Sequence, residues 1–280
     1  DSEVGDLILI NDGLIRLKII RKKETSIVCE IENGGILSPR KGMNLPGMKL
    51  STPSLTEKDF EDLNFLIDKP LDYIALSFVR KSDDITQLKK WLTKKGKPIP
   101  VIAKIEKKEA IDTFESILNL ADGIMVARGD LGVELSLAKV PVIQKEIIKR
   151  CNETGKLVIT ATQMLESMIN SPIPTRAEAA DVANAVWDGS DVVMLSGETS
   201  VGKYPIETVK MMHEIIINAE QHFIMNENIK FQIPEAFEEN LFDSVLKGIT
   251  SVAEQIKANA IVVFTYKGRA ARGLAKFRPA

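Results

Sequence analysis

The stretch of sequence that decides the fold is a short apolar run ending in a lysine and a glutamate, Val101-Ile102-Ala103-Lys104-Ile105-Glu106. Further apolar runs lie on either side of it, at residues 73–79, 123–126, 157–160 and 192–195. Amphipathic segments separate these runs. Buried apolar strands that alternate with helices are typical of βαβ units and a parallel sheet. The sequence therefore predicts an α/β fold with five parallel strands, where a closed (β/α)₈ barrel has eight.

Helices are predicted between the runs from apolar spacing and from end signals. Apolar side chains over residues 110–118 recur at helical spacing and share one face. A second helix over residues 142–152 is expected to stop at Gly155, a typical C-terminal cap. A third begins at Thr175, whose spacing to Glu178 fits a capping box.

The two ends of the chain show other patterns. Residues 1–47 contain short apolar runs separated by turn residues such as Asp12-Gly13, and this pattern predicts β-hairpins. Residues 223–236 are polar and interrupted by Pro234, as in a linker. Beyond them, residues 241–256 predict a helix and residues 260–265 a strand, the start of a further α/β unit.

Composition narrows the classes of function. The 280 residues are 44% hydrophobic and 27% charged, with a net charge of −2, so no overall field favours nucleic acid or an anionic membrane. No apolar run has the length of a membrane-spanning helix. Cys29 and Cys151 are expected to be reduced thiols in a cytoplasmic protein. Because there are only two histidines, any chemistry must rest on carboxylates, lysines, hydroxyls and the backbone.

Polar side chains follow every apolar run, at what would be its carboxyl end. Parallel strands of an α/β fold present these ends at one edge, where ligands bind, so the side chains are expected to converge. Glu106 and Asp130 supply carboxylates of the kind that hold Mg²⁺, and Lys104 adds a positive charge beside Glu106. Gly129 allows close backbone approach to an anion. The pattern predicts a metal-assisted anion site.

Hydroxyl and carboxylate groups complete the predicted site. Thr162 and Ser196 offer hydroxyls, and Glu198 offers a carboxylate that can carry protons. Each candidate also has an ordinary structural explanation, since a lysine–glutamate pair is usually a surface ion pair and an aspartate before a helix is usually an N-cap. Spacing alone therefore supports a polar ligand site, with or without a divalent metal.

Several long stretches of the sequence carry a resemblance to known proteins: Asn44-Leu45-Pro46-Gly47, Ser77-Phe78-Val79-Arg80, Ile102-Ala103-Lys104-Ile105-Glu106, residues 122–134, residues 159–168, Pro174-Thr175-Arg176-Ala177-Glu178 and Met194-Leu195-Ser196-Gly197-Glu198-Thr199. These stretches resemble the pyruvate kinase family. They run over nearly the whole chain in the family's order, and strings of this length are highly specific.

The resemblance implies a (β/α)₈ barrel with an inserted β-rich lid domain and a C-terminal α/β regulatory domain. In these terms, residues 1–47 are the second half of the lid, residues 48–222 carry the last five barrel strands, and residues 223–236 are a linker. Residues 237–280 begin the C-terminal domain. The family's first three barrel strands and most of its C-terminal domain have no counterpart in this sequence, as expected for an internal piece.

The resemblance also implies a reaction of glycolysis: phosphoryl transfer from phosphoenolpyruvate to ADP, which gives ATP and, after protonation of the enolate, pyruvate. Lys104 matches the lysine that stabilises the transferring phosphoryl group and the enolate, and Glu106 and Asp130 match the Mg²⁺ or Mn²⁺ ligands. The remaining matches are the amides of Gly129 and Asp130 for the substrate carboxylate, Thr162 for substrate contact, Ser196 and Glu198 for proton delivery, Lys41 for the nucleotide, and Asp12 facing the closed cleft.

Further expectations concern cofactors, partners and rival functions. The family implies K⁺, whose ligands lie in strands that this sequence lacks, and a cytoplasmic homotetramer. One rival is a Mg²⁺-dependent aldolase or lyase barrel acting on pyruvate or phosphoenolpyruvate, although the lid-like residues 1–47 argue against an enzyme that needs no nucleotide cover. Another rival is a truncated, non-catalytic chain that only associates with other subunits.

Overall fold

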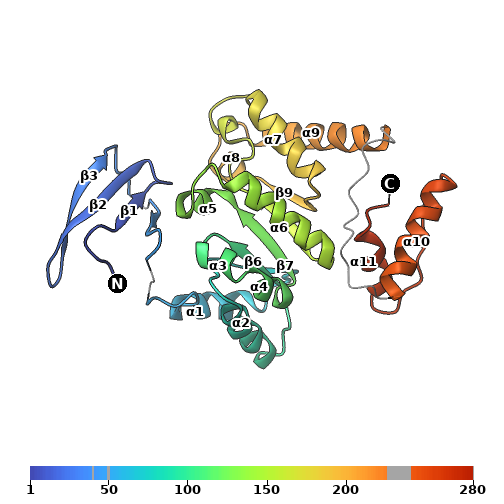
Figure 1. Ribbon diagram of the computed structural model, residues 1–280, viewed down its shortest axis with the longest axis horizontal. Helices are drawn as coiled ribbons and strands as arrows, with labels where there is room; N and C mark the ends of the chain where they lie inside the picture. Colours follow the sequence, from blue (N-terminus) through green and yellow to red (C-terminus); the bar gives the residue numbers. More distant parts are fainter. Residues whose placement is uncertain (40, 49–50, 226–240, 280) are drawn as a thin grey trace. The chain divides into compact units, whose positions relative to one another are not determined.

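The structure, a computed structural model, describes residues 1–39, 41–48, 51–225 and 241–279 in two compact units, Asp1–Gln144 and Lys145–Ala280 (Figure 1). The elements of the first unit are β1 (Leu7–Ile10), β2 (Ile15–Lys22), β3 (Ile27–Asn33), β4 (Met43–Asn44), α1 (Glu57–Leu66), β5 (Ile74–Leu76), α2 (Ser82–Lys94), β6 (Val101–Ile105), α3 (Lys108–Asp112), α4 (Phe114–Leu120), β7 (Gly123–Ala127) and α5 (Arg128–Glu134). Helix α6 (Val140–Thr154) spans the boundary. The second unit contains β8 (Leu157–Ala161), the 3₁₀ helix η1 (Glu166–Ile169), α7 (Arg176–Trp187), β9 (Val192–Met194), α8 (Gly197–Ser200), α9 (Pro205–Met225), α10 (Leu241–Gln255) and α11 (Arg269–Ala275).

The N-terminal strands form an antiparallel sheet in the order β3-β2-β1-β4, and Figure 1 shows β1, β2 and β3 side by side. The turn between β1 and β2 contains Asn11 and Asp12 at φ of 56° and 55°, followed by Gly13 at 83°. Consecutive left-handed residues give a tight turn whose twist matches the strands, which is why the Asp-Gly pair occurs there. The predicted β-hairpins are confirmed.

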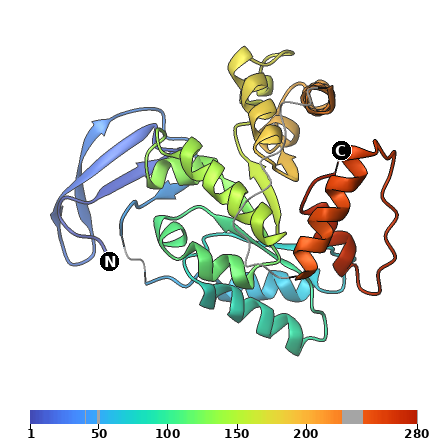
Figure 2. The same cartoon turned by 45° about the vertical axis from the view of Figure 1, so that its right-hand side comes forward.

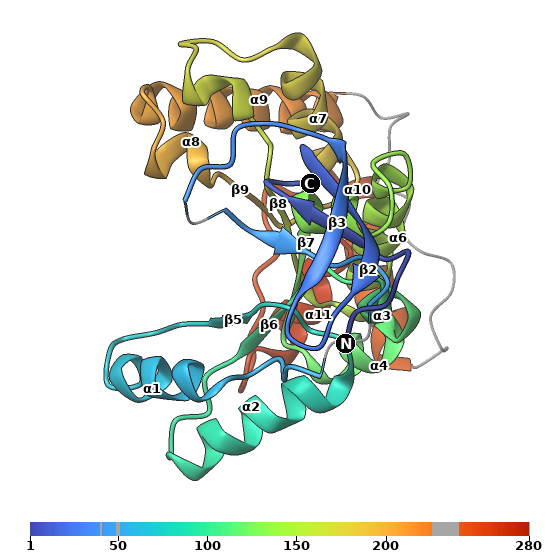
Figure 3. The ribbon, with the colours of Figure 1, turned by 90° about the vertical axis from the view of Figure 1, so that its left-hand side faces the viewer.

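The first unit also contains three parallel strands, β5, β6 and β7. Ile74 pairs with Val101 and Ile105 with Val126, and Figure 3 shows β5 beside β6. Every residue of β7 is buried, and Lys104 is the one residue of β6 that is not. Near-continuous burial on both faces is what an apolar strand in a helix-covered parallel sheet requires.

The second unit pairs β8 with β9 in parallel, with Ile159 opposite Val192. Its main core joins η1, α7 and α9 through the buried side chains Met164, Leu165, Met168, Val182, Ala185 and Met212. The five predicted parallel strands are thus confirmed, three in the first unit and two in the second.

Two of the predicted helix end signals are confirmed, and one predicted helix is divided. Helix α6 is followed by Gly155 at φ of 65°, and α7 begins with a capping box between Thr175 and Glu178. The predicted helix over residues 110–118 is instead two short helices, α3 and α4, which meet at Thr113. The Thr113 hydroxyl lies 2.9 Å from the carbonyl oxygens of Arg80 and Glu109, and such side-chain bonds to the backbone compete with helix continuation.

The C-terminal segment forms a helix pair and lacks one predicted strand. Helices α10 and α11 lie together in Figure 2 and share a small core of Leu246, Leu274 and Phe277. The predicted strand over residues 260–265 is wrong, because this stretch has no regular structure and leaves Val262 81% and Phe264 96% exposed. No strand of the described residues pairs with it, and a strand needs a neighbour for its ladder hydrogen bonds.

The predicted linker starts inside a helix. Helix α9 continues to Met225, so residues 223–225 are helical, and the rest of the predicted linker lies outside the described residues. Within the described part, no helix has both the length and the apolar character needed to cross a bilayer. Cys29 and Cys151 are free thiols, as predicted from their small number.

Glu178 provides a test of the cap of α7. Its carboxylate accepts hydrogen bonds from the Ser167 N–H (2.7 Å), the Ser167 hydroxyl (2.5 Å) and the Thr175 N–H (2.7 Å). Burial raises the pKa of Glu178, but these hydrogen bonds outweigh burial and hold the pKa below its ordinary value. A depressed pKa in the folded state stabilises the protein above the unfolded value of about 4.3, and this stability is lost as the pH falls further.

We expect Glu178→Gln to lower the free energy of unfolding at pH 7 by about 1–2 kcal/mol, because the neutral amide accepts fewer and weaker hydrogen bonds. The difference from the wild type should be smaller at pH 3 than at pH 7, because protonation of the carboxyl group in the unfolded chain below about 4.3 already removes part of this stabilisation. Urea unfolding at both pH values measures this, with Glu220→Gln on the exposed face of α9 as the control. An equal difference at pH 7 and pH 3 would contradict the assignment.

Candidate active site

Strand β6 places a lysine and a glutamate in direct contact at its carboxyl end. The Lys104 ammonium lies 2.6 Å from Glu106 Oε1, and it donates a hydrogen bond to the Ser77 hydroxyl at 3.0 Å. The other oxygen of Glu106 accepts the Phe78 N–H at 2.7 Å. The Glu106 side chain is only 1% exposed, whereas Lys104 is 25% exposed. The buried carboxylate is therefore fixed from both sides, and the lysine reaches solvent.

Asp130 leaves the neighbouring strand at the same edge. Ile105, just before Glu106, pairs with Val126, and Asp130 follows Val126 by four residues as the third residue of α5. Asp130 Oδ1 accepts a hydrogen bond of 3.2 Å from the side-chain amide of Asn44 in β4. Gly129 and Asp130 both lie in the first turn of α5, and backbone N–H groups in the first turn of a helix are a type of group that can bind anions.

The two carboxylates have the donor chemistry that a hard divalent cation prefers. Each ionised carboxylate has about four lone-pair sites, so the hydrogen bonds and the ion pair described leave Glu106 and Asp130 with acceptor sites to spare. Mg²⁺ is commonly held by one or two carboxylates, with water and substrate oxygens completing its shell. Across the described residues, no group of three or more His, Cys, Asp and Glu side chains is arranged to hold a metal.

The predicted nucleotide-side residues lie at one end of the antiparallel sheet. Strand β1 pairs with β4, and the Asn11 N–H donates to the Gly42 carbonyl at 3.1 Å just beyond the last paired residues. Asp12 and Lys41 flank this hydrogen bond, and both side chains are exposed. The structure thus brings together the segment that follows β1, which contains Asp12, and the segment that precedes β4, which contains Lys41.

Thr162 occupies an unusual backbone conformation at the end of β8. Its φ is 70°, and the next residue, Gln163, has a φ of 54°. A β-branched residue at positive φ is strained, and such strain is concentrated at functional sites. The Thr162 hydroxyl donates to the Ala161 carbonyl at 2.6 Å.

Glu198 joins the segments that follow β8 and β9. Its side chain is fully buried, and it accepts hydrogen bonds from the Leu165 N–H at 3.1 Å and the Ser196 N–H at 2.8 Å. A buried carboxylate bound by two backbone amides sets the positions of both segments. The sequence predicted Glu198 as a site carboxylate, but it did not predict the hydrogen bonds from Leu165 and Ser196.

Asn44, Ser77 and Phe78 contact Asp130, Lys104 and Glu106 respectively and were not selected as site residues from the sequence. Asn44 and Ser77 are polar residues within the stretches that resemble a known family, which is the signal that could have found them. Phe78 acts through its backbone N–H, and no residue type reveals such a contact.

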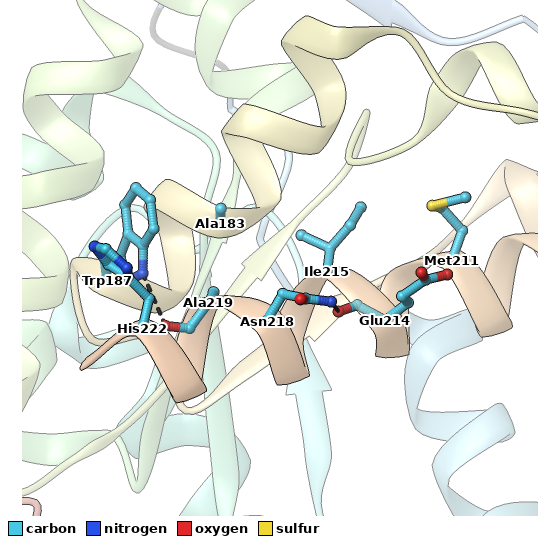
Figure 4. A pocket seen from close by; sticks show the side chains of 8 residues that line it. All are labelled: Ala183, Trp187, Met211, Glu214, Ile215, Asn218, Ala219 and His222. Carbon is cyan, nitrogen blue, oxygen red and sulfur yellow. Dashed lines mark hydrogen bonds between the residues drawn. The ribbon is translucent and has the colours of Figure 1, made fainter. Parts of the chain in front are cut away.

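A hollow in the second unit lies between α7 and α9 (Figure 4). The Trp187 indole N–H donates to the Ala219 carbonyl at 3.1 Å, and its ring lies 5.9 Å from the His222 ring. The lining is mainly apolar, with Met211 and Ile215 on α9. None of the predicted site residues lines it, so we assign it no part in the chemistry.

The parallel strands with helices between them, and the Lys104–Glu106 pair at the end of β6, place this chain in the class of α/β proteins. Residues 1–209 match the family model described as the pyruvate kinase barrel domain. The chain belongs to the pyruvate kinase family.

Individual relatives agree along the whole chain. It is 46% identical to the pyruvate kinases of Staphylococcus saprophyticus and Geobacillus stearothermophilus and 42% identical to that of Clostridium perfringens. Each match covers 100% of this chain and 48%, 48% and 59% of the respective relatives. The chain thus spans about half the length of the curated relatives it matches.

Proposed function

We propose that this chain provides the lysine and metal-binding part of a pyruvate kinase active site, which transfers a phosphoryl group from phosphoenolpyruvate to ADP and yields pyruvate and ATP. The observation that carries the proposal is the contact between Lys104 and the buried Glu106 at the end of β6, with Asp130 at the same edge. Family membership supports the same reaction.

The roles of the first unit follow from charge and position. Glu106 and Asp130 would hold Mg²⁺ or Mn²⁺, which when bound supplies positive charge beside the phosphoryl oxygens. Lys104, partly exposed beside Glu106, stabilises negative charge on the transferring phosphoryl group and then on the enolate oxygen. The amides of Gly129 and Asp130 at the start of α5 bind the substrate carboxylate.

The roles of the remaining residues follow from their surroundings. Thr162, held in a strained conformation, contacts the substrate. Ser196 belongs to the group that delivers the proton to the enolate. Because both oxygens of Glu198 accept backbone amides, we propose that Glu198 supports proton delivery by positioning Ser196. Lys41 and Asp12, exposed on the antiparallel sheet, face the nucleotide.

Other properties come from the family resemblance and stay predictions. These are a requirement for K⁺ with ligands outside this sequence, a homotetrameric assembly, and a cytoplasmic location. Free Cys29 and Cys151 are consistent with a reducing compartment.

The proposed function is tested by incubating the chain with phosphoenolpyruvate, ADP, Mg²⁺ and K⁺ and measuring ATP and pyruvate. We expect Glu106→Gln to lose Mn²⁺ binding, measured by electron paramagnetic resonance, and, where the chain alone supports turnover, to reduce the rate of ATP formation at least about 100-fold. Carbon–carbon cleavage without ATP would favour the aldolase or lyase class. A folded wild-type chain that binds Mn²⁺ without forming either product would favour a non-catalytic role.

A further inference from the structure

Phe78 has a backbone conformation that its residue type disfavours. Its φ is 54°, in the left-handed region. A bulky residue at positive φ is strained, because its Cβ lies too close to the backbone. Strain of this kind persists only where the surroundings impose it, so something near Phe78 must hold the conformation.

The ring of Phe78 is not what holds it. The side chain is 50% exposed, and the Lys107 ammonium lies 6.0 Å from the centre of its ring. A ring that is half in solvent gains too little from packing to impose a disfavoured backbone conformation.

Both polar groups of the Phe78 backbone are instead held by hydrogen bonds. The N–H donates to Glu106 Oε2 at 2.7 Å, and the carbonyl oxygen accepts the Ser54 hydroxyl at 3.1 Å. The Ser54 oxygen in turn accepts the Arg80 Nε–H at 3.3 Å. The N–H and the carbonyl group of Phe78 lie on either side of its strained φ torsion, so these hydrogen bonds hold the torsion from both ends.

The residue before Phe78 contacts the partner of Glu106. Ser77 accepts a hydrogen bond from Lys104 at 3.0 Å, and Lys104 lies 2.6 Å from Glu106. Two consecutive residues at the end of β5 therefore hold the two charged side chains at the end of β6.

We propose that Phe78 is a positioning residue, whose left-handed conformation directs its N–H at Glu106 and so sets the carboxylate for a divalent cation. This inference rests on the proposed function for the presence of a cation at Glu106. A hydrogen-bond donor to a metal-binding carboxylate fixes the orientation of that carboxylate, and loss of such donors commonly weakens metal binding 10- to 100-fold.

The test compares substitutions that differ in their tolerance of positive φ. Phe78→Asn and Phe78→Val both remove the ring, but asparagine tolerates the left-handed region and β-branched valine does not. Mn²⁺ affinity without substrate is measured by electron paramagnetic resonance, and hydrogen exchange of the residue-78 amide is measured by NMR. We expect Phe78→Asn to match the wild type within about threefold in Mn²⁺ affinity and in protection of the amide from exchange. We expect Phe78→Val to lose about tenfold or more in each of these two quantities.

Other outcomes overturn the proposal. Equal losses in Phe78→Asn and Phe78→Val would show that the ring matters instead of the backbone, and retention of both readouts in Phe78→Val would show that the conformation does not matter. If Phe78→Val fails to fold, Phe78→Gly and Phe78→Ala replace the pair, with the glycine variant expected to be the tighter binder. If the wild type binds Mn²⁺ no better than Glu106→Gln, the proposed metal site fails, and amide exchange alone decides the role of Phe78.

Discussion

Glu198→Ala is expected to lower the free energy of unfolding by about 3–4 kcal/mol, a large fraction of the total for a chain of ordinary stability. The substitution removes the acceptor of two backbone amides, Leu165 N–H and Ser196 N–H, at a position that is fully buried. Each buried amide left without a partner costs about 1–3 kcal/mol. The missing carboxylate also leaves a small cavity, which adds to the cost.

Two further variants separate the carboxylate from the general effect of substitution. Glu198→Gln has one acceptor oxygen for two amides, so we expect about half the loss seen with alanine. Glu214→Ala changes an exposed glutamate within α9 and should alter stability by less than about 0.5 kcal/mol. Urea unfolding followed by circular dichroism ranks the three variants. A Glu198→Ala variant within about 1 kcal/mol of the wild type would contradict the predicted role of the carboxylate in holding Leu165 and Ser196.

The predicted fold succeeded where local signals were strong. The run Val101–Ile105 is a strand with the predicted bounds. Four of its five residues are apolar and the fifth, Lys104, has a long aliphatic side chain, and such a run suits a sheet covered on both faces. Helix α6 ends beside Gly155 because glycine, which has no Cβ, adopts a φ of 65° at little cost. These features depend on residues close together in sequence.

The predictions that failed depended on distant partners. Residues 260–265 have the composition of a strand, but composition does not supply the neighbouring strand that hydrogen bonding requires. The break between α3 and α4 at Thr113 coincides with a hydroxyl near the Arg80 carbonyl, 33 residues away. Sequence spacing does not contain that contact.

The candidate site shows the same division. Lys104 and Glu106 were selected from one strand, and their contact follows from being two residues apart on one face. The contact of Asn44 with Asp130 joins residues 86 positions apart, and the Phe78 N–H belongs to a group that every residue but proline carries. Convergence of the polar ends across all five strands stays a prediction.

The second large effect is expected at Lys104, the charged residue of β6. We expect Lys104→Met to reduce turnover of phosphoenolpyruvate and ADP by roughly 10²- to 10³-fold, mainly in kcat. The ammonium is the partly exposed cation beside Glu106, the carboxylate proposed to bind the metal, and methionine keeps the length of the side chain without the charge. Turnover within tenfold of the wild type would exclude the proposed role of Lys104.

Metal binding should respond to Lys104→Met in the opposite direction. In the wild type the Lys104 ammonium lies 2.6 Å from Glu106 Oε1. A divalent cation bound at Glu106 would have to share that oxygen with the ammonium and would be repelled by its positive charge. Removing the ammonium should tighten Mn²⁺ binding roughly threefold or more. The buried Glu106 then loses its partner, which costs about 3 kcal/mol of stability without metal, and added Mn²⁺ should restore much of that loss.

Lys107→Met is the matched control for these three readouts. Lys107 forms an ion pair with Glu134 whose side chains are 12% and 2% exposed, so breaking it removes a similarly buried pair in the same unit. We expect a comparable loss of stability that Mn²⁺ does not restore, with turnover and Mn²⁺ affinity close to those of the wild type. Restoration by Mn²⁺ in Lys104→Met alone would locate the cation at Glu106, because Lys107→Met also leaves a buried carboxylate, that of Glu134, without its lysine.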